Sequence, residues 1–146
     1  KLYKKYNAWK EQREQYYEQK SQQDKKNKDL RFGETAIIAG EFEITVVSLD
    51  NPKEGIDGIL ITFKVKNIND YKFPDSILLS DFNIWDKNGQ TYRGEEYEGS
   101  ELTSDTEIPY NKEVTGQILF KFPTESFTFD RLTYRAAVLN GVAIWT

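Results

Sequence analysis

The sequence predicts a mainly β protein in which an antiparallel β-sandwich follows an N-terminal α-helix. Up to Arg31 the chain consists almost entirely of Lys, Arg, Glu, Gln, Asp, Asn and aromatic residues, without Gly, Pro, Val or Ile. From Phe32 onward, short alternating runs of apolar and polar residues are separated by Gly, Pro, Asn and Asp, which is the pattern of strands and turns. We therefore expect residues 1–31 to form a basic helical tether and linker, and residues 32–146 to form one sandwich domain.

Charge changes at the same boundary. Residues 1–31 hold ten of the 20 basic residues and five of the 24 acidic ones, so this segment carries +5 and the remainder −9. The asymmetry suggests that the two parts meet different partners, and the acidic domain is not expected to bind nucleic acid. The chain contains no Cys and no His. This composition excludes disulfides, Cys-ligated zinc, thiol nucleophiles and His-dependent catalysis, so we expect neither an enzyme nor a bound cofactor.

The first predicted element is a helix from about Leu2 to Lys20 that extends at most to Lys26. Its signal is one stripe of residues at alternating spacings of four and three, namely Leu2, Tyr6, Trp9, Arg13 and Tyr16. Because the stripe is aromatic and includes Arg13, it does not favour a stable coiled coil. Residues 21–29 are expected to form an irregular linker, since nothing in them is apolar enough to be buried.

Two interpretations of this helix stay open. It is either a solvated spacer whose Trp9 rests on a neighbour or on the sandwich, or a membrane-proximal segment whose aromatic rings lie at a lipid interface. In the second interpretation the residues that meet anionic head groups are Lys1, Lys4, Lys5, Trp9 and Lys10.

The strands are predicted in order from alternation of apolar and polar residues. They cover residues 41–49, 59–66, 82–85, 91–92, 114–122, 132–138 and 142–145. Asn88-Gly89 is a hairpin signal, because such pairs accept the positive φ that tight turns require. Inward positions include Phe63, Val65, Phe82, Ile84, Ile118 and Phe120. Strands this short and regularly spaced are typical of an antiparallel sandwich.

The order of several strand and turn motifs resembles the telokin-like family of bacterial extracellular domains. In chain order, the motifs are residues 33–35, 40–46, 63–67, 80–82, 86–92 and 116–120. The resemblance covers about Phe32 to the end. It implies an immunoglobulin-like fold, export, and a membrane or lipid anchor upstream, mainly in Gram-positive bacteria. It implies no catalytic residues.

Four aromatic residues, Trp85, Tyr92, Tyr97 and Tyr110, are candidates for partner binding because they cluster near the hairpin and the acidic segment after it. Phe82 and Ile84 are predicted to face the core, so Trp85, the next residue along the strand, is expected on the outer sheet face. There its ring would be available for protein contacts or sugar stacking. The alternative is that Trp85 is covered by residues 71–79 or by Trp145.

Acidic residues gather in segment 95–107. Oxygen-rich loops bind calcium, but the spacing is not that of an EF-hand, so a solvated acidic loop is the better interpretation. A glycosidase carboxylate pair requires rigid placement that a Gly- and Ser-containing loop does not favour.

These patterns, taken with the export and anchoring that the telokin-like resemblance implies, lead us to expect a non-catalytic domain of the cell envelope, extracellular and membrane-anchored in the full-length protein, that binds an envelope protein. In the membrane-proximal interpretation of the helix, an anionic membrane surface near the N-terminus is a further partner. A carbohydrate-binding module using Trp85, Tyr92 and Tyr110 is the alternative, and an enzyme comes third. Because the chain begins at Lys1 and lacks Met, we expect that a segment precedes it, although no apolar run here reaches the roughly 20 residues of a membrane span.

Overall fold

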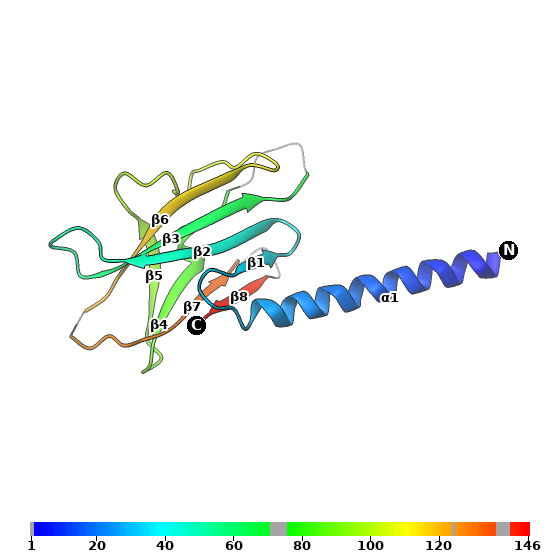
Figure 1. Cartoon of the computed structure of the whole chain (residues 1–146), viewed down its shortest axis with the longest axis horizontal. Helices are drawn as coiled ribbons and strands as arrows, with labels where there is room; N and C mark the ends of the chain where they lie inside the picture. Colours follow the sequence, from blue (N-terminus) through cyan, green and yellow to red (C-terminus); the bar gives the residue numbers. More distant parts are fainter. Residues whose placement is uncertain (1, 71–75, 124, 137–140) are drawn as a thin grey trace.

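The computed structural model describes residues 2–70, 76–123, 125–136 and 141–146 and confirms the predicted fold class. One helix leads into eight antiparallel strands that form an immunoglobulin-like sandwich, with the helix projecting from one side (Figure 1). The elements are α1 (Leu2–Asn27), β1 (Thr35–Ile38), β2 (Phe42–Asp50), β3 (Gly58–Asn67), a short 3-10 turn (Leu79–Asp81), β4 (Phe82–Asp86), β5 (Thr91–Glu96), β6 (Glu113–Lys121), β7 (Phe129–Arg135) and β8 (Val142–Trp145).

The strands form one continuous sheet in the order β1-β2-β3-β6-β5-β4-β7-β8. Strand β5 belongs to both layers, because its first half pairs with β4 (Ile84 opposite Tyr92) and its second half pairs with β6 (Gly94 opposite Phe120). Only glycine fits at this crossing, since a Cβ on Gly94 would lie 2.5 Å from the carbonyl oxygen of Leu79. The sheet therefore folds over itself into two facing layers.

The core lies between these layers and contains the inward residues that alternation predicts. Phe63, Val65, Phe82, Ile84, Ile118 and Phe120 are all fully buried. Phe63 of β3 contacts Phe82 of β4 across the layers, with ring centroids 4.6 Å apart, and Phe82 in turn contacts Tyr134 of β7. Burial of this aromatic row, together with the other buried residues between the layers, stabilises the fold.

The predicted hairpin between β4 and β5 is present. Gly89 has a φ of +83°, and the buried Asp86 accepts hydrogen bonds on Oδ1 from the N–H groups of Asn88 and Gln90, each at 2.9 Å. Gly89 thus adopts the positive φ that the turn requires, and the hydrogen bonds to Asp86 hold the turn in this conformation. The short strand β1 was not predicted, because only Ala36 and Ile38 of its four residues are buried and the pattern is too brief to identify.

The prediction of an irregular linker over residues 21–29 is wrong up to Asn27, whereas the longer of the two predicted helix ends, at Lys26, is within one residue of the observed one. The helix continues to Asn27, whose side chain is only 1% exposed. Its Nδ2 donates to the carbonyl oxygen of Ile37 at 2.8 Å, and its Oδ1 accepts from the N–H of Ile37 at 3.3 Å. The side-chain amide therefore replaces a neighbouring strand at the free edge of β1.

Leu30 completes this closure at the opposite edge of the sheet. Its backbone pairs in parallel with β8, accepting from Thr146 N at 2.9 Å and donating to the carbonyl of Ile144 at 3.0 Å. Its side chain is 4% exposed, inside the core. The segment from Asn27 to Leu30 thus joins both edge strands, β1 and β8, which also explains why the sheet is nearly closed.

Candidate functional site

The stripe predicted on α1 runs the length of the helix, because α1 extends further than expected. Its described members have spacings of three and four and are Tyr6, Trp9, Arg13, Tyr16, Lys20, Gln23 and Asn27, which we call the α1 stripe. Asn27 docks on β1, and Trp9 lies 18 residues earlier, which is five full turns of an α-helix. Trp9 therefore points to the same side of α1 as Asn27, which is the side of β1.

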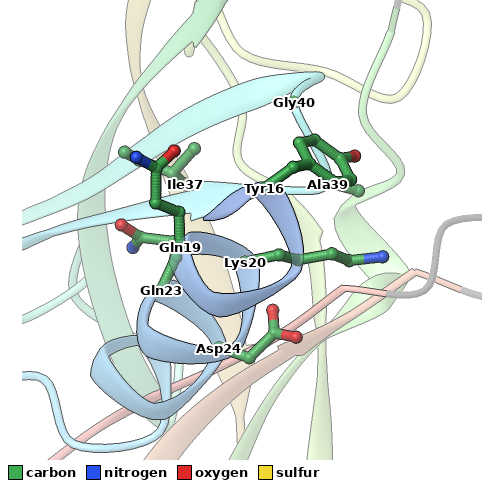
Figure 2. Close-up of a pocket in the computed structure, with 8 residues that line it drawn as sticks. All are labelled: Tyr16, Gln19, Lys20, Gln23, Asp24, Ile37, Ala39 and Gly40. Atoms are coloured by element: carbon green, nitrogen blue, oxygen red, sulfur yellow. The ribbon is translucent and has the colours of Figure 1, made fainter. Parts of the chain in front are cut away.

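A groove of about 390 Å³ lies where the α1 stripe meets the sandwich (Figure 2). Residues of α1 form one wall, including Tyr16, Lys20 and Gln23, and the other wall is formed by Ile37, Ala39 and Gly40 of β1 and the turn after it. Ala39 and Gly40 both have positive φ, at 48° and 70°, so this wall is a tight turn with a defined shape. The groove is therefore lined by well-defined backbone on both sides.

Beyond the groove, the rings on α1 project into solvent. Of the nine large hydrophobic side chains found exposed in the described residues, five lie on the helix: Tyr3, Tyr6, Trp9, Tyr16 and Tyr17. Trp9 is 54% exposed and touches Tyr6, at a centroid distance of 6.3 Å, without resting on the sandwich. Arg13 lies between two rings, with its guanidinium carbon 5.5 Å from the centroid of Trp9 and 5.6 Å from that of Tyr17. These cation–π contacts place the positive charge of Arg13 over an exposed aromatic surface.

Charge is divided between the two sides of α1. Arg13 and Lys20 belong to the α1 stripe, and Lys5, Lys10 and Lys26 flank it together with one acidic residue, Asp24. Glu11, Glu14 and Glu18 lie on the opposite face, with Lys4 and Lys25 among them. Of the predicted membrane-proximal residues, Lys5, Trp9 and Lys10 thus lie on or beside the stripe, Lys4 lies on the opposite face, and Lys1 is outside the described residues.

The four predicted partner-binding aromatics are not brought together into one surface. Trp85 lies on the outer face of β4, where its Nε1 donates to Thr133 Oγ1 at 3.0 Å and the Arg131 guanidinium covers its ring at 4.1 Å. Tyr92 is opposite Ile84 and so points to the inner side, where it contacts Phe122 and Phe127. Trp85 and Tyr92 therefore belong to opposite faces of the same hairpin.

The other two residues lie in the loop between β5 and β6. The Tyr97 hydroxyl accepts a hydrogen bond from the N–H of Lys53 at 3.2 Å, and Tyr110 is 53% exposed without a ring neighbour among the described residues. The predicted cover of Trp85 by Trp145 is wrong, because Trp145 is fully buried and its Nε1 donates to the carbonyl of Glu34. Residues 71–75, in the other predicted cover, lie outside the described residues.

The acidic segment 95–107 is partly a packed loop and not only a solvated one. Leu102 is fully buried, and the Ser100 hydroxyl accepts from the N–H of Gln117 at 2.8 Å. In the described part of the chain, no group of three Asp, Glu, His or Cys residues is close enough to hold a metal ion. Glu98 instead accepts a hydrogen bond from Lys53 Nζ at 3.1 Å, and this contact raises the pKa of Lys53 above its ordinary value. Partial burial raises the pKa of Asp81, the last residue of the 3-10 turn before β4.

Comparisons with known proteins address the fold and the family. A family model described as "Domain of unknown function (DUF4352)" matches residues 24–144. A secreted protein from Mycobacterium tuberculosis, MPT63, has a similar crystal structure, with a TM-score of 0.59, 18% identity, and coverage of 80% of this chain and 95% of that one. The yjhA protein from Bacillus subtilis is similar at a TM-score of 0.52 and 26% identity, covering 73% of this chain and 79% of that one.

No curated protein sequence matches the chain. The comparisons agree on an all-β domain, whereas the telokin-like resemblance is not confirmed by them. Across the described residues, α1 and the 3-10 turn offer no segment apolar enough and long enough to cross a bilayer.

Proposed function

The chain belongs to the family described as a domain of unknown function (DUF4352), and from this premise we propose that it is a non-catalytic domain that binds another protein outside the cell membrane. A structural neighbour is described as a secreted protein, which supports the extracellular assignment. The basic N-terminal segment supports the further proposal of an anchor upstream in the full-length protein. Descent from the telokin-like extracellular domains is part of the same proposal.

One observation carries the binding assignment, namely the exposed α1 stripe that continues into the groove beside β1. Monomeric proteins seldom expose large contiguous aromatic surfaces unless another molecule covers them. Trp, Tyr and Arg are also the residues that contribute most to protein–protein affinity, and Trp9, Arg13 and Tyr16 follow one another along the stripe. The helix presents them on a rigid support at the edge of the sandwich.

Sugar binding is supported less well. Carbohydrate-binding platforms use aromatic rings that lie side by side on one exposed face. Trp85 is on the outer face and is covered by Arg131, whereas Tyr92 packs on the inner side with Phe122 and Phe127. The alternative function therefore lacks the arrangement that it requires at these residues.

The extracellular assignment is tested by thiol labelling of intact cells that express the full-length protein. Because this chain has no Cys, Val47→Cys places a single thiol in it, on an exposed position of β2. We expect a membrane-impermeant maleimide to label Val47→Cys before lysis. The matched control is Ala143→Cys, at a fully buried position, which should stay unlabelled until the protein is denatured. Labelling of Val47→Cys only after lysis would contradict the assignment.

The binding assignment is tested by photo-crosslinking on the same cells. A photoreactive phenylalanine derivative replaces Tyr16 in the α1 stripe, and in the control it replaces Tyr110, an exposed tyrosine in the loop between β5 and β6. We expect a discrete cross-linked protein product from position 16 and none of that size from position 110. Identical products from both positions would show that the groove has no special role.

A further inference from the structure

We propose that the partner of the α1 stripe is an acidic amphipathic α-helix of another protein, packed along α1 and ending in the groove beside β1. This inference rests on the proposed protein-binding function and specifies its partner. It follows from the period of the stripe, from the charges around it, and from the shape of the groove.

The period of the α1 stripe is that of helix–helix packing. Its spacings alternate between three and four, a mean of 3.5 residues, and its aromatic members are Tyr6, Trp9 and Tyr16. The later positions of the stripe are polar, and the last of them, Asn27, is docked on β1. A second helix that winds along α1 meets the exposed part of this stripe, from Tyr6 to Lys20, at every turn. A lipid surface requires a broad apolar face and imposes no 3.5-residue repeat, and here the stripe itself contains Arg13, Lys20 and Gln23.

The charges select the partner. Positions flanking the stripe carry Lys5, Lys10, Lys26 and one acidic residue, Asp24, which lines the groove. The stripe itself adds Arg13 and Lys20, so this side of α1 is basic overall. A second copy of this chain offers only α1 as a long helix in its described residues, so self-association would bring these cations together. A helix with Glu or Asp beside an apolar seam places carboxylates against them instead. The guanidinium of Arg13, which lies over the rings of Trp9 and Tyr17, is a bidentate donor for such a carboxylate.

The shape of the groove disfavours a lipid bilayer as the partner of the α1 stripe. The wall formed by Ile37, Ala39 and Gly40 stands opposite Tyr16 and Gln23, so the end of the α1 stripe is accessible to an elongated segment but not to a bilayer plane. Ile37 is 37% exposed and provides an apolar contact on this wall. The partner helix would therefore touch α1 along its length and β1 only at the groove.

The test uses a fluorescent synthetic helix with Leu at the seam positions and Glu at the flanking positions, titrated with the whole chain by fluorescence anisotropy. A second probe carries Lys in place of Glu. We expect saturable binding of the Glu probe and none of the Lys probe. Vesicles with anionic phosphatidylglycerol form the third arm, and their binding in place of the Glu probe would overturn the inference in favour of a membrane.

Two double variants with the same change in net charge locate the surface. Arg13→Glu with Lys20→Glu reverses charge in the α1 stripe, and Lys4→Glu with Lys25→Glu does so on the opposite face. We expect the first pair to weaken binding by about tenfold or more, because attraction becomes repulsion at two sites, and the second pair to change it by less than about threefold. Equal losses in both pairs would overturn the inference.

Circular dichroism shows whether each variant keeps its helix, and Tyr16→Ala, compared with Tyr110→Ala, supplies a test without charge reversal. We expect only Tyr16→Ala to weaken binding of the Glu probe. If the Glu probe fails to bind while cross-linking from position 16 still captures a protein on cells, the acidic-helix partner is wrong and the protein-binding function stands.

Discussion

Asn27→Ala should destabilise the whole sandwich although Asn27 belongs to the helix. The substitution removes a buried amide that makes two hydrogen bonds to the backbone of Ile37, and it also removes the acceptor for Gln23 Nε2 at 2.8 Å. Because Asn27 closes the edge of β1 and Leu30 pairs with β8 three residues later, the lost contacts lie where the two sheet edges are joined.

The magnitude follows from the hydrogen bonds. Each one contributes about 0.5–1.5 kcal/mol net, and a backbone group left without a partner costs about 1–3 kcal/mol. Ile37 is at an edge where water has some access, and Ala favours the helix more than Asn does, so both effects reduce the loss. We expect unfolding free energy to fall by about 1.5–3 kcal/mol, which lowers the melting temperature by roughly 4–10 °C for a chain of this size.

Thermal unfolding followed by circular dichroism or calorimetry measures this loss, with Gln12→Ala on the exposed part of α1 as the control. That control should leave the melting temperature unchanged or slightly raised. Removing residues up to 21 should likewise have little effect, whereas removal through Leu30 should lower the melting temperature strongly. A loss below about 0.5 kcal/mol for Asn27→Ala would refute the idea that α1 closes the sheet, and α1 would then be a simple appendage.

Three further predictions concern the sandwich itself. Phe63→Ala, at the centre of the aromatic row, should cost about 3–5 kcal/mol in chemical denaturation, and a cost below about 1 kcal/mol would contradict its core position. Gly116→Ala should cost about 1–3 kcal/mol, because its Cβ would lie 2.4 Å from Cβ of Leu102; wild-type stability would mean that the loop yields freely. Asp81→Asn should stabilise the protein near pH 7 and have little effect near pH 2. The folded-state pKa of Asp81 is raised, so its ionisation costs stability as pH rises above the unfolded pKa, and an equal effect at both pH values would be inconsistent with this cause.

Local patterns predicted much of the fold because they depend on neighbouring residues. Alternation placed Phe63, Phe82 and Phe120 inside and Trp85 on an outer face, and the Asn88-Gly89 pair placed the hairpin. The stripe on α1 was also readable, since the three-and-four spacing of Tyr6, Trp9 and Tyr16 fixes one helix face. The sequence thus predicted the half of the candidate site that lies on α1.

Contacts between distant segments were not readable in the same way. Arg131 is far from Trp85 along the chain, and only the register of β4 with β7 brings its guanidinium over the indole ring. The four aromatics grouped by sequence are near one another along the chain, yet Trp85 and Tyr92 are separated by the two faces of a sheet. Closeness in sequence is a poor guide to closeness in space when strands alternate sides.

The sequence by itself determined the strands, the helix and the inward residues, because each depends on the period of side chains along one local segment. Tertiary structure alone decided what lies beside α1. Asn27 and Leu30 read as part of a polar linker, but they meet edge strands β1 and β8, which come from opposite ends of the sandwich sequence. The groove exists because this closure turns the α1 stripe toward Ile37 and Gly40, and no period within the helix encodes which strand edge it will face.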